Sequence, residues 1–145
     1  ARRLLAHERS RAVVSDFFAQ LLYLKDVLKA EKDKTAFPTW TAETRASAWA
    51  ETERFLTATL FEGDGLWRTL LTSNESFVDA RLAPLYGVSG AGSSLTKATL
   101  PAAQRAGLLT RAAFLASHAR PAHGALLTPI KRGSCAKTSR RPSRT

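Results

Sequence analysis

Between residues 8 and 30, apolar side chains recur every three or four positions, which is the spacing of an amphipathic helix. Charged residues of this stretch, such as Lys25, fall mostly on the other face. A second apolar stripe follows Thr41, whose side chain suits the N-cap of a helix. The two patterns predict helices over residues 10–28 and 42–60. We expect them to pack face to face through Phe17, Phe18, Leu21, Trp49 and Leu56.

Shorter helical segments are predicted in the rest of the chain. Residues 66–71 indicate a short helix, and residues 77–86 indicate an irregular helical stretch that Pro84 interrupts. Residues 87–99 are rich in Gly, Ser and Thr and are predicted to form a loop. A last helix is expected over residues 108–115. No strand alternation, repeat or heptad pattern stands out, so we predict an all-α fold, an irregular helical domain of about four to six helices with a disordered basic C-terminal tail.

The composition indicates a core large enough for one domain, and the charge is distributed unevenly along the chain. The chain has 145 residues, of which 44% are hydrophobic, which is enough for one domain. Of its net charge of +10, residues 131–145 contribute +6 and contain no acid. This leaves a basic nucleic-acid-binding module as an alternative function, with weak binding of phosphates by the tail. Because the tail has no aromatic residue to stack on bases, we expect no specific nucleic acid as a partner.

Several other classes of protein and site are not favoured. No segment approaches the ~20 consecutive apolar residues that span a bilayer, so no membrane span is predicted. The first residues become polar too quickly for a signal peptide, and the absence of Met indicates a sequence taken from a longer chain or an incomplete gene product. The single Cys135 leaves no cysteine pair for zinc or for covalent haem attachment. We therefore expect no cofactor in this chain.

The histidines do not form a convincing set of metal ligands. His118 and His123 lie five positions apart and flank Pro121, so they are not a pair on one helix face. No carboxylate lies near them in the sequence. An axial haem contact is conceivable for His118, but an exposed or capping position is the preferred interpretation. We predict no metal site and retain His118 as a candidate contact residue.

Four acidic residues invite comparison with a catalytic acid–base pair. Glu51 and Glu53 are two positions apart, so a helix points them about 200° away from each other. Glu62 and Asp64 flank Gly63 in a predicted turn. All four are expected to be solvated, and no catalytic residue is predicted.

The three tryptophans suggest a second alternative, part of a hydrolase or binder that acts on extracellular polysaccharide. Trp49 and Trp67 lie at apolar positions of predicted helices, so we expect them in the core. Trp40 lies near a helix start, is less constrained, and is a candidate contact residue. Lys131 and Arg132 are the remaining contact candidates. A hydrolase would need paired carboxylates, which the sequence does not indicate.

Blocks of sequence occur in an order that is similar to a known pair of domains. They lie within residues 1–20, 51–55, 70–71, 77–87 and 105–133. On these blocks the chain resembles the tandem of domains of unknown function 1592 and 1588 of the planctomycete-type secreted, cytochrome-associated proteins. The resemblance implies four regions: a first domain over 1–87, a Gly/Ser-rich linker over 88–102, the start of a second domain over 103–133, and a tail over 134–145.

The resemblance also implies a location and a role. It implies a fragment of a larger bacterial protein that is periplasmic, on the cell surface or secreted, with a haem domain elsewhere in the full-length chain. The partners would be other domains of the same full-length protein. No catalytic residue is implied. We therefore predict an uncharacterised helical structural or interaction module beside cytochrome-c-like or binding domains, with no enzyme activity expected in this fragment.

The sequence departs from the family pattern at three places. Asp79 stands where the family usually has Asn, and Leu127-Thr-Pro129 where it has Thr-Ser-Pro, so we expect polar turns there to be held less well. After Gly133 the family continues with an apolar pair and Val-Arg-Glu. A neighbouring reading frame would restore such a continuation, so we interpret residues 134–145 as frameshifted. Without the rest of the second domain, four apolar residues are expected to lose packing partners: Leu108, Leu109, Phe114 and Leu115.

Overall fold

The computed structural model of the chain describes residues 7, 9–89 and 91–119. Within these residues, no helix has the length and apolar character needed to cross a membrane. Some predictions concern residues outside the described part: His123, Leu127-Thr-Pro129, Lys131, Arg132 and residues 134–145.

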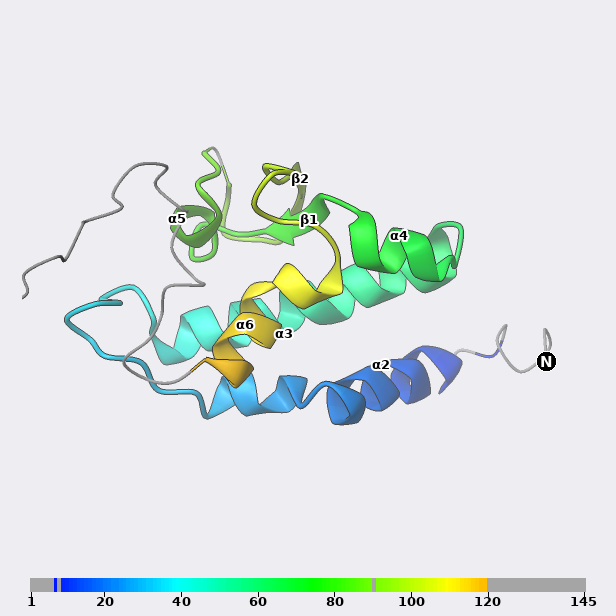
Figure 1. Cartoon of the computed structure of the whole chain (residues 1–145), viewed down its shortest axis with the longest axis horizontal. Helices are drawn as coiled ribbons and strands as arrows, with labels where there is room; N and C mark the ends of the chain where they lie inside the picture. The colour runs from blue at the N-terminus through cyan, green and yellow to red at the C-terminus, as the bar shows by residue number, and fades with distance from the viewer. Residues whose placement is uncertain (1–6, 8, 90, 120–145) are drawn as a thin grey trace, which may run out of the picture.

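Helices make up most of the described chain, and two short strands accompany them (Figure 1). The predicted all-α fold is therefore corrected to a mostly helical fold with a small sheet. The α-helices are α2 (Arg9–Leu21), α3 (Ala42–Thr57), α4 (Trp67–Thr72), α5 (Ala83–Tyr86) and α6 (Ala112–His118). The other helical segments are the 3-10 helices η1 (Leu24–Leu28) and η3 (Leu108–Thr110) and the π-helix η2 (Ala58–Glu62). The strands are β1 (Glu75–Val78) and β2 (Thr96–Thr99).

Helix α3 lies at the centre of the fold (Figure 1). Helices α2 and η1 run along one side of it, and the sheet lies on the other side. Helix α6 packs against both α3 and η1. Helix α3 begins where predicted, because the Thr41 hydroxyl accepts a hydrogen bond from the backbone N–H of Thr44 at 3.3 Å. It continues into the looser turn of η2, so the helix predicted over residues 42–60 is confirmed.

The helix predicted over residues 10–28 is interrupted after α2. Tyr23 has a φ of 50°, in the left-handed region, and this ends the α-helix before η1 begins. Phe18 is buried before the break, while Leu24 and Val27 are both 0% exposed after it. A continuous helix, turning by ~100° per residue, would point Leu24 and Val27 away from the side on which Phe18 lies. The break therefore lets both segments bury apolar side chains against the same core.

Helix α2 packs on α3 through a narrower face than predicted. Phe18 and Leu56 are 6% and 2% exposed, so their predicted place in this contact is confirmed. Phe17 and Leu21 are 57% and 53% exposed, so the prediction for these two residues is wrong. They lie at a four-residue spacing with Val13, which is 66% exposed, on the side of α2 that faces solvent. We call Val13, Phe17 and Leu21 the α2 stripe.

The small sheet occupies segments that were predicted as helix and loop. Strands β1 and β2 pair antiparallel, with Phe77 opposite Lys97. Strand β1 gives no alternating pattern because its last three residues are all buried. Strand β2 lies within the predicted linker over residues 88–102, and the Leu100 amide extends the pairing by donating to the Asn74 carbonyl at 2.8 Å. Neither four-residue strand has a sequence signal of its own.

Pro84 and Gly87 lie at the two ends of α5, near the sheet. Pro84 lies in the first turn of α5, where its missing N–H costs no hydrogen bond, so it starts a helix instead of interrupting one. Gly87 has a φ of 65° and ends α5 in the left-handed conformation, which glycine adopts without strain.

The chain after residue 100 packs closely onto the rest of the fold. Gly107 has a φ of 67°, and a Cβ atom at this position would lie 2.0 Å from the carbonyl oxygen of Leu71. Glycine is therefore required for this close approach. Of the four apolar residues expected to lose packing partners, only Leu109 is exposed, at 43%, while Leu108 is 1% exposed and the other two are partly buried. That expectation is wrong for three of the four.

Substitution of two leucines tests this core. We expect Leu56→Ala to lower the free energy of unfolding by about 2–5 kcal/mol, because it leaves a cavity beside α2. Leu66→Ala, at a position that is 56% exposed, should change it by less than about 1 kcal/mol. Chemical denaturation monitored by circular dichroism measures both. Equal losses for the two variants would contradict this assignment of the core.

Candidate functional site

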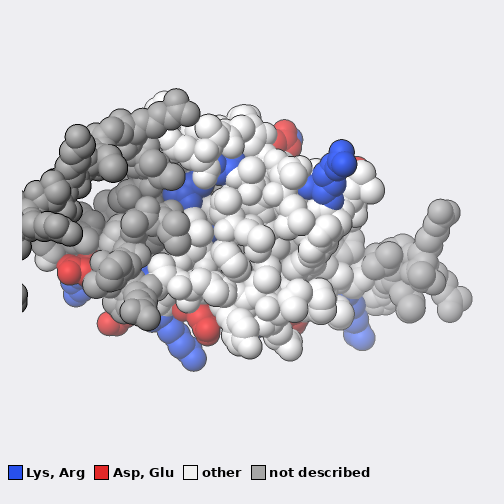
Figure 2. All heavy atoms as spheres, in the orientation of Figure 1, with Lys and Arg blue, Asp and Glu red and all other residues white. Residues whose placement is uncertain are grey.

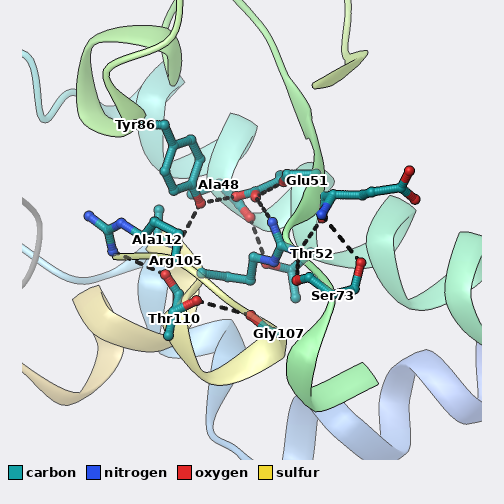
Figure 3. A network of polar contacts seen from close by, with 12 residues as sticks. Ala48, Glu51, Thr52, Ser73, Tyr86, Arg105, Gly107, Thr110 and Ala112 are labelled. Carbon is teal, nitrogen blue, oxygen red and sulfur yellow. Dashed lines mark hydrogen bonds and ion pairs between the residues drawn. The ribbon is translucent and has the colours of Figure 1, made fainter. Parts of the chain in front are cut away.

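A buried network around Glu51 is the most concentrated set of polar contacts in the described chain (Figure 3). Glu51 projects from α3 and is 0% exposed. One carboxylate oxygen accepts the hydroxyl of Ser76 in β1 in a short hydrogen bond, and the other accepts the hydroxyl of Tyr86 in α5 at 2.6 Å. Arg111 completes the set, with Nη1 at 3.4 Å from the carboxylate, and is 1% exposed. Residues from three elements and from the start of α6 thus meet at one carboxylate.

Tyr86 and Arg111 extend this network to the backbone. The Tyr86 hydroxyl accepts the amide of Ala112, the first residue of α6, at 2.8 Å. The Arg111 guanidinium donates to the carbonyl of Glu75, and its carbon lies 3.9 Å from the centre of the Phe55 ring. The network therefore ties the start of α6 to α3, β1 and α5.

Burial governs the protonation of these groups. Loss of hydration raises the pKa of Glu51, against the opposing attraction of Arg111 and the hydrogen bonds from the two hydroxyls. Burial, together with the nearby Glu51 charge, raises the pKa of Tyr86 well above its usual range. Burial likewise lowers the pKa of Arg105, whose guanidinium lies 5.4 Å from the centre of the Tyr86 ring.

The geometry of the Glu51 network favours a structural role over catalysis. A general acid or base must reach the reacting group of a substrate, and a shifted pKa indicates an active site only where the group lines a cleft. Glu51 is fully buried, and both of its oxygens already accept hydrogen bonds. The prediction that Glu51 is solvated is therefore wrong. Its sequence position carried a signal, because Glu51 is three residues after Ala48 and four before Phe55, both of which lie on the buried face of α3.

A groove of about 560 Å³ lies on the surface between η2, α4 and the sheet. Most charged side chains that line the groove form ion pairs or hydrogen bonds with neighbouring residues. Arg54 and Glu62 form an ion pair at 2.8 Å, and Lys97 pairs with Glu75 at 2.9 Å. The Asp64 carboxylate accepts the Leu66 amide and the Thr69 hydroxyl. Among the described residues, no group of three or more His, Cys, Asp or Glu side chains could hold a metal ion.

The structure agrees with the positions expected for Trp49 and His118, and differs from those expected for Trp40 and Trp67. Trp40 is 6% exposed and its indole N–H donates to the Ala30 carbonyl at 2.8 Å, so the candidate contact residue lies in the core. Trp67 is 58% exposed and stacks on Phe18, so its predicted core position is wrong. Trp49 packs partly buried against the core, as predicted. His118 is exposed at the end of α6, and its ring contacts the preceding turn.

Asp79 forms a second polar centre, at the turn between β1 and α5. Its carboxylate accepts the amides of Arg81 and Leu82 at 3.0 and 2.9 Å and the hydroxyl of Ser47 at 2.6 Å. Burial would raise the pKa of Asp79, but these hydrogen bonds and the Arg81 guanidinium together hold it below its usual range. The turn that was expected to be poorly held thus has several donors at one carboxylate.

The described chain is close to electrically balanced. It contains thirteen Lys or Arg and eleven Asp or Glu residues, so only +2 of the net charge of +10 belongs to this part. On the face in Figure 2, the charged side chains are scattered singly around a broad surface of other residues. No basic patch forms on this face of the described chain.

Comparison with known families gives a match over the first part of the chain. A model described as PSD4, a protein of unknown function (DUF1592), matches residues 1–88. The chain belongs to this family. Within the DUF1592 match lie Glu51, Ser76 and Tyr86, whereas Arg111 lies beyond its end. No curated protein and no solved structure matches the chain.

Removing one hydroxyl tests the network. We expect Tyr86→Phe to lower the free energy of unfolding by about 1–3 kcal/mol, because the Glu51 carboxylate and the Ala112 amide each lose a buried partner. The matched control is Tyr23→Phe, since Tyr23 is 67% exposed and its change should stay within about 0.5 kcal/mol. Denaturant titration measures the free energy of unfolding of both variants. A decrease for Tyr86→Phe no larger than that for Tyr23→Phe would contradict the network.

A second test uses pH. A carboxyl whose pKa is lowered by folding stabilises the protein above its unfolded pKa, and this contribution is lost as the pH falls through the folded value. We expect the stability of the wild-type chain relative to Asp79→Asn to decrease as the pH falls below about 4, because Asn does not titrate. Unfolding free energies of both proteins between neutral pH and pH ~2 provide the comparison. A difference that does not change with pH would argue against a lowered pKa of Asp79.

Proposed function

We propose that this chain is a helical structural module of a larger exported protein, and that it holds neighbouring domains in place without catalysing a reaction. The observation that carries this proposal is the buried Glu51–Arg111 pair, which joins two parts of the chain into one core. The membership of a family of unknown function is consistent with a role that has no recognised chemistry.

The geometry supports the structural role in two ways. Burial shifts the pKa values of Glu51 and Tyr86, and both residues are at most 3% exposed, so no substrate has access to them. The charged residues of the surface groove are paired with one another across short distances. Both arrangements stabilise the fold, and neither presents a free reactive group.

The wider setting is part of the same proposal. The order of the sequence blocks over residues 1–133 supports a tandem with a second domain of unknown function, 1588, in a planctomycete-type protein. The same resemblance supports a periplasmic, cell-surface or secreted location and a cytochrome-c-like or binding domain elsewhere in the full-length chain. The partners of the module are then the other domains of that chain.

The two rival functions have less support. The described residues carry a net charge of only +2, which gives little electrostatic attraction for nucleic acid. A polysaccharide-binding role would have relied on Trp40, which is 6% exposed and forms a hydrogen bond within the core.

The structural role predicts opposite effects for breaking and for replacing the buried pair. Arg111→Met alone leaves an unpaired carboxylate in the core and should lower the free energy of unfolding by about 3–5 kcal/mol. The double variant Glu51→Leu/Arg111→Met removes both charges together and should recover most of that loss. Urea unfolding of the isolated chain measures these effects, and Glu51→Leu alone completes the cycle.

The same double variant tests the role in the full-length protein. Protease sites introduced on either side of the module allow the flanking domains to be separated from it, and their co-elution reports whether they stay associated. We expect association to be retained in the double variant and weakened in the single variant Arg111→Met. A double variant that folds like wild type but loses association would contradict a purely structural role for the pair.

A further inference from the structure

Strand β2 forms an edge of the small sheet, and its backbone groups point alternately toward β1 and away from it. The Leu100 amide donates to the Asn74 carbonyl at 2.8 Å, so every second residue of β2, counted from Leu100, directs its backbone groups toward β1. The N–H and C=O groups of Lys97 and Thr99 therefore point away from β1. Both residues are exposed, and no described residue forms a hydrogen bond with these four groups. An open strand edge of this kind is a template for pairing with another strand.

The opposite edge of the sheet is covered by the chain itself. The last three residues of β1 are buried. At its first residue, the Glu75 amide donates to the Ser73 hydroxyl at 3.2 Å, and the Glu75 carbonyl accepts the Arg111 guanidinium. These bonds also support the alternation, because Glu75 is paired with Thr99 and its backbone groups likewise point away from the partner strand. Of the two strands, β2 is therefore the one with an accessible edge.

The free groups of β2 are complementary to those of a second copy of the chain. When two β2 strands pair antiparallel about a two-fold axis at Ala98, Lys97 of each copy lies opposite Thr99 of the other. Each of these two pairs exchanges two hydrogen bonds, so all four free groups of each copy gain a partner. Pro101, two residues beyond Thr99, has no N–H and ends the free edge without leaving a donor unpaired.

The side chains and the helical layer permit this approach. The two Ala98 residues meet at the close position of the ladder, where Cα atoms are ~4.5 Å apart and a methyl group fits. The Lys97 ammonium groups do not lie directly opposite each other, and each is paired with Glu75 at 2.9 Å. The two β1 strands would be three strand spacings apart, or ~14 Å. Helices pack at ~8–10 Å, so the α3 helices that contact β1 fit side by side.

We propose that two copies of this chain associate through β2 into a symmetric dimer. The two hairpins then form one four-stranded sheet in the order β1–β2–β2–β1. The contact consists mainly of backbone hydrogen bonds and buries little apolar surface, so the dimer is reversible and depends on protein concentration. The proposal is independent of the structural role of the Glu51 network, which lies within each copy.

Sedimentation equilibrium of the whole chain measures this association. We expect the average mass to rise toward that of two chains as the protein concentration increases. Thr99→Pro removes an N–H that does not pair with β1 and eliminates two of the four hydrogen bonds of the dimer, so the Kd should rise about tenfold or more. Thr99→Val keeps the N–H and the β-branched shape, so its Kd should stay within about threefold of wild type. Circular dichroism of both variants checks that the fold is retained.

Disulfide trapping provides a second test that needs no proline in the strand. In a Cys135→Ser background, Ala98→Cys places two thiols at a Cα separation of ~4.5 Å across the dimer axis, which a disulfide spans, so mild oxidation should give a covalent dimer. Thr96→Cys in the same background is the matched control. Two residues at this position lie about 13 Å apart along the paired strands and should cross-link poorly.

Three results would overturn the proposal. The first is a wild-type chain that stays monomeric up to about 1 mM. The second is a dimer that Thr99→Pro leaves as tight as wild type, which would place the contact on another surface, such as the α2 stripe. The third is cross-linking of Ala98→Cys that is no faster than that of Thr96→Cys.

Discussion

The fold depends on the neutralisation of one buried carboxylate. Glu51 lies on the central helix at full burial, and an unpaired charge there would cost several kcal/mol. Arg111 supplies the opposite charge, while Ser76 and Tyr86 supply hydrogen bonds to the two oxygens. These partners come from separate elements, so each element must be in place before the charge is satisfied. The central helix, the sheet, α5 and α6 are thereby made parts of one cooperative unit.

A second constraint works together with this pair. The backbone of Gly107 approaches Leu71 so closely that no side chain fits between them, and its amide donates to the Ser73 carbonyl at 2.7 Å. This contact brings the chain back to α4 just before Arg111 enters the core. At the other end of α6, Lys32 donates to the carbonyls of Ala116 and Ala119, which satisfies acceptors that a helix end leaves open. Helix α6 is thus held at both ends by residues distant in the sequence.

The features that could be predicted from the sequence are those that depend on neighbouring residues. The Thr41 cap, the Gly87 terminus and the helix over residues 42–60 follow from local hydrogen bonding and spacing. The break at Tyr23 could not be predicted, because the apolar pattern continues through it and only burial of η1 against α3 and α6 favours the turn. The two strands were missed for a similar reason, since each is four residues long and is stabilised by its partner.

The candidate site also depends on residues that are distant in the sequence, and this limits its prediction. The position of Glu51 between Ala48 and Phe55 on one helix face was enough to indicate burial, and a carboxylate on that face calls for a cation. Nothing in the local sequence identifies Arg111 as that cation, because 60 positions separate the two residues. The exposure of Phe17 and Trp67 was equally hidden, since an apolar stripe does not reveal which of its members face the core.

The separation of Glu51 and Arg111 also bears on how such a protein changes during evolution. Glu51 lies inside the DUF1592 match over residues 1–88 and Arg111 lies outside it, so the end of the match falls between two residues that form one ion pair. Replacement of either charged residue alone destabilises the fold, because the other charge remains buried without its partner. Replacement of both residues by apolar ones avoids this loss of stability. We therefore expect the two residues to be retained or replaced together. Inheritance of the first 88 residues without the segment that follows would pass on a core with a charge and no counterion.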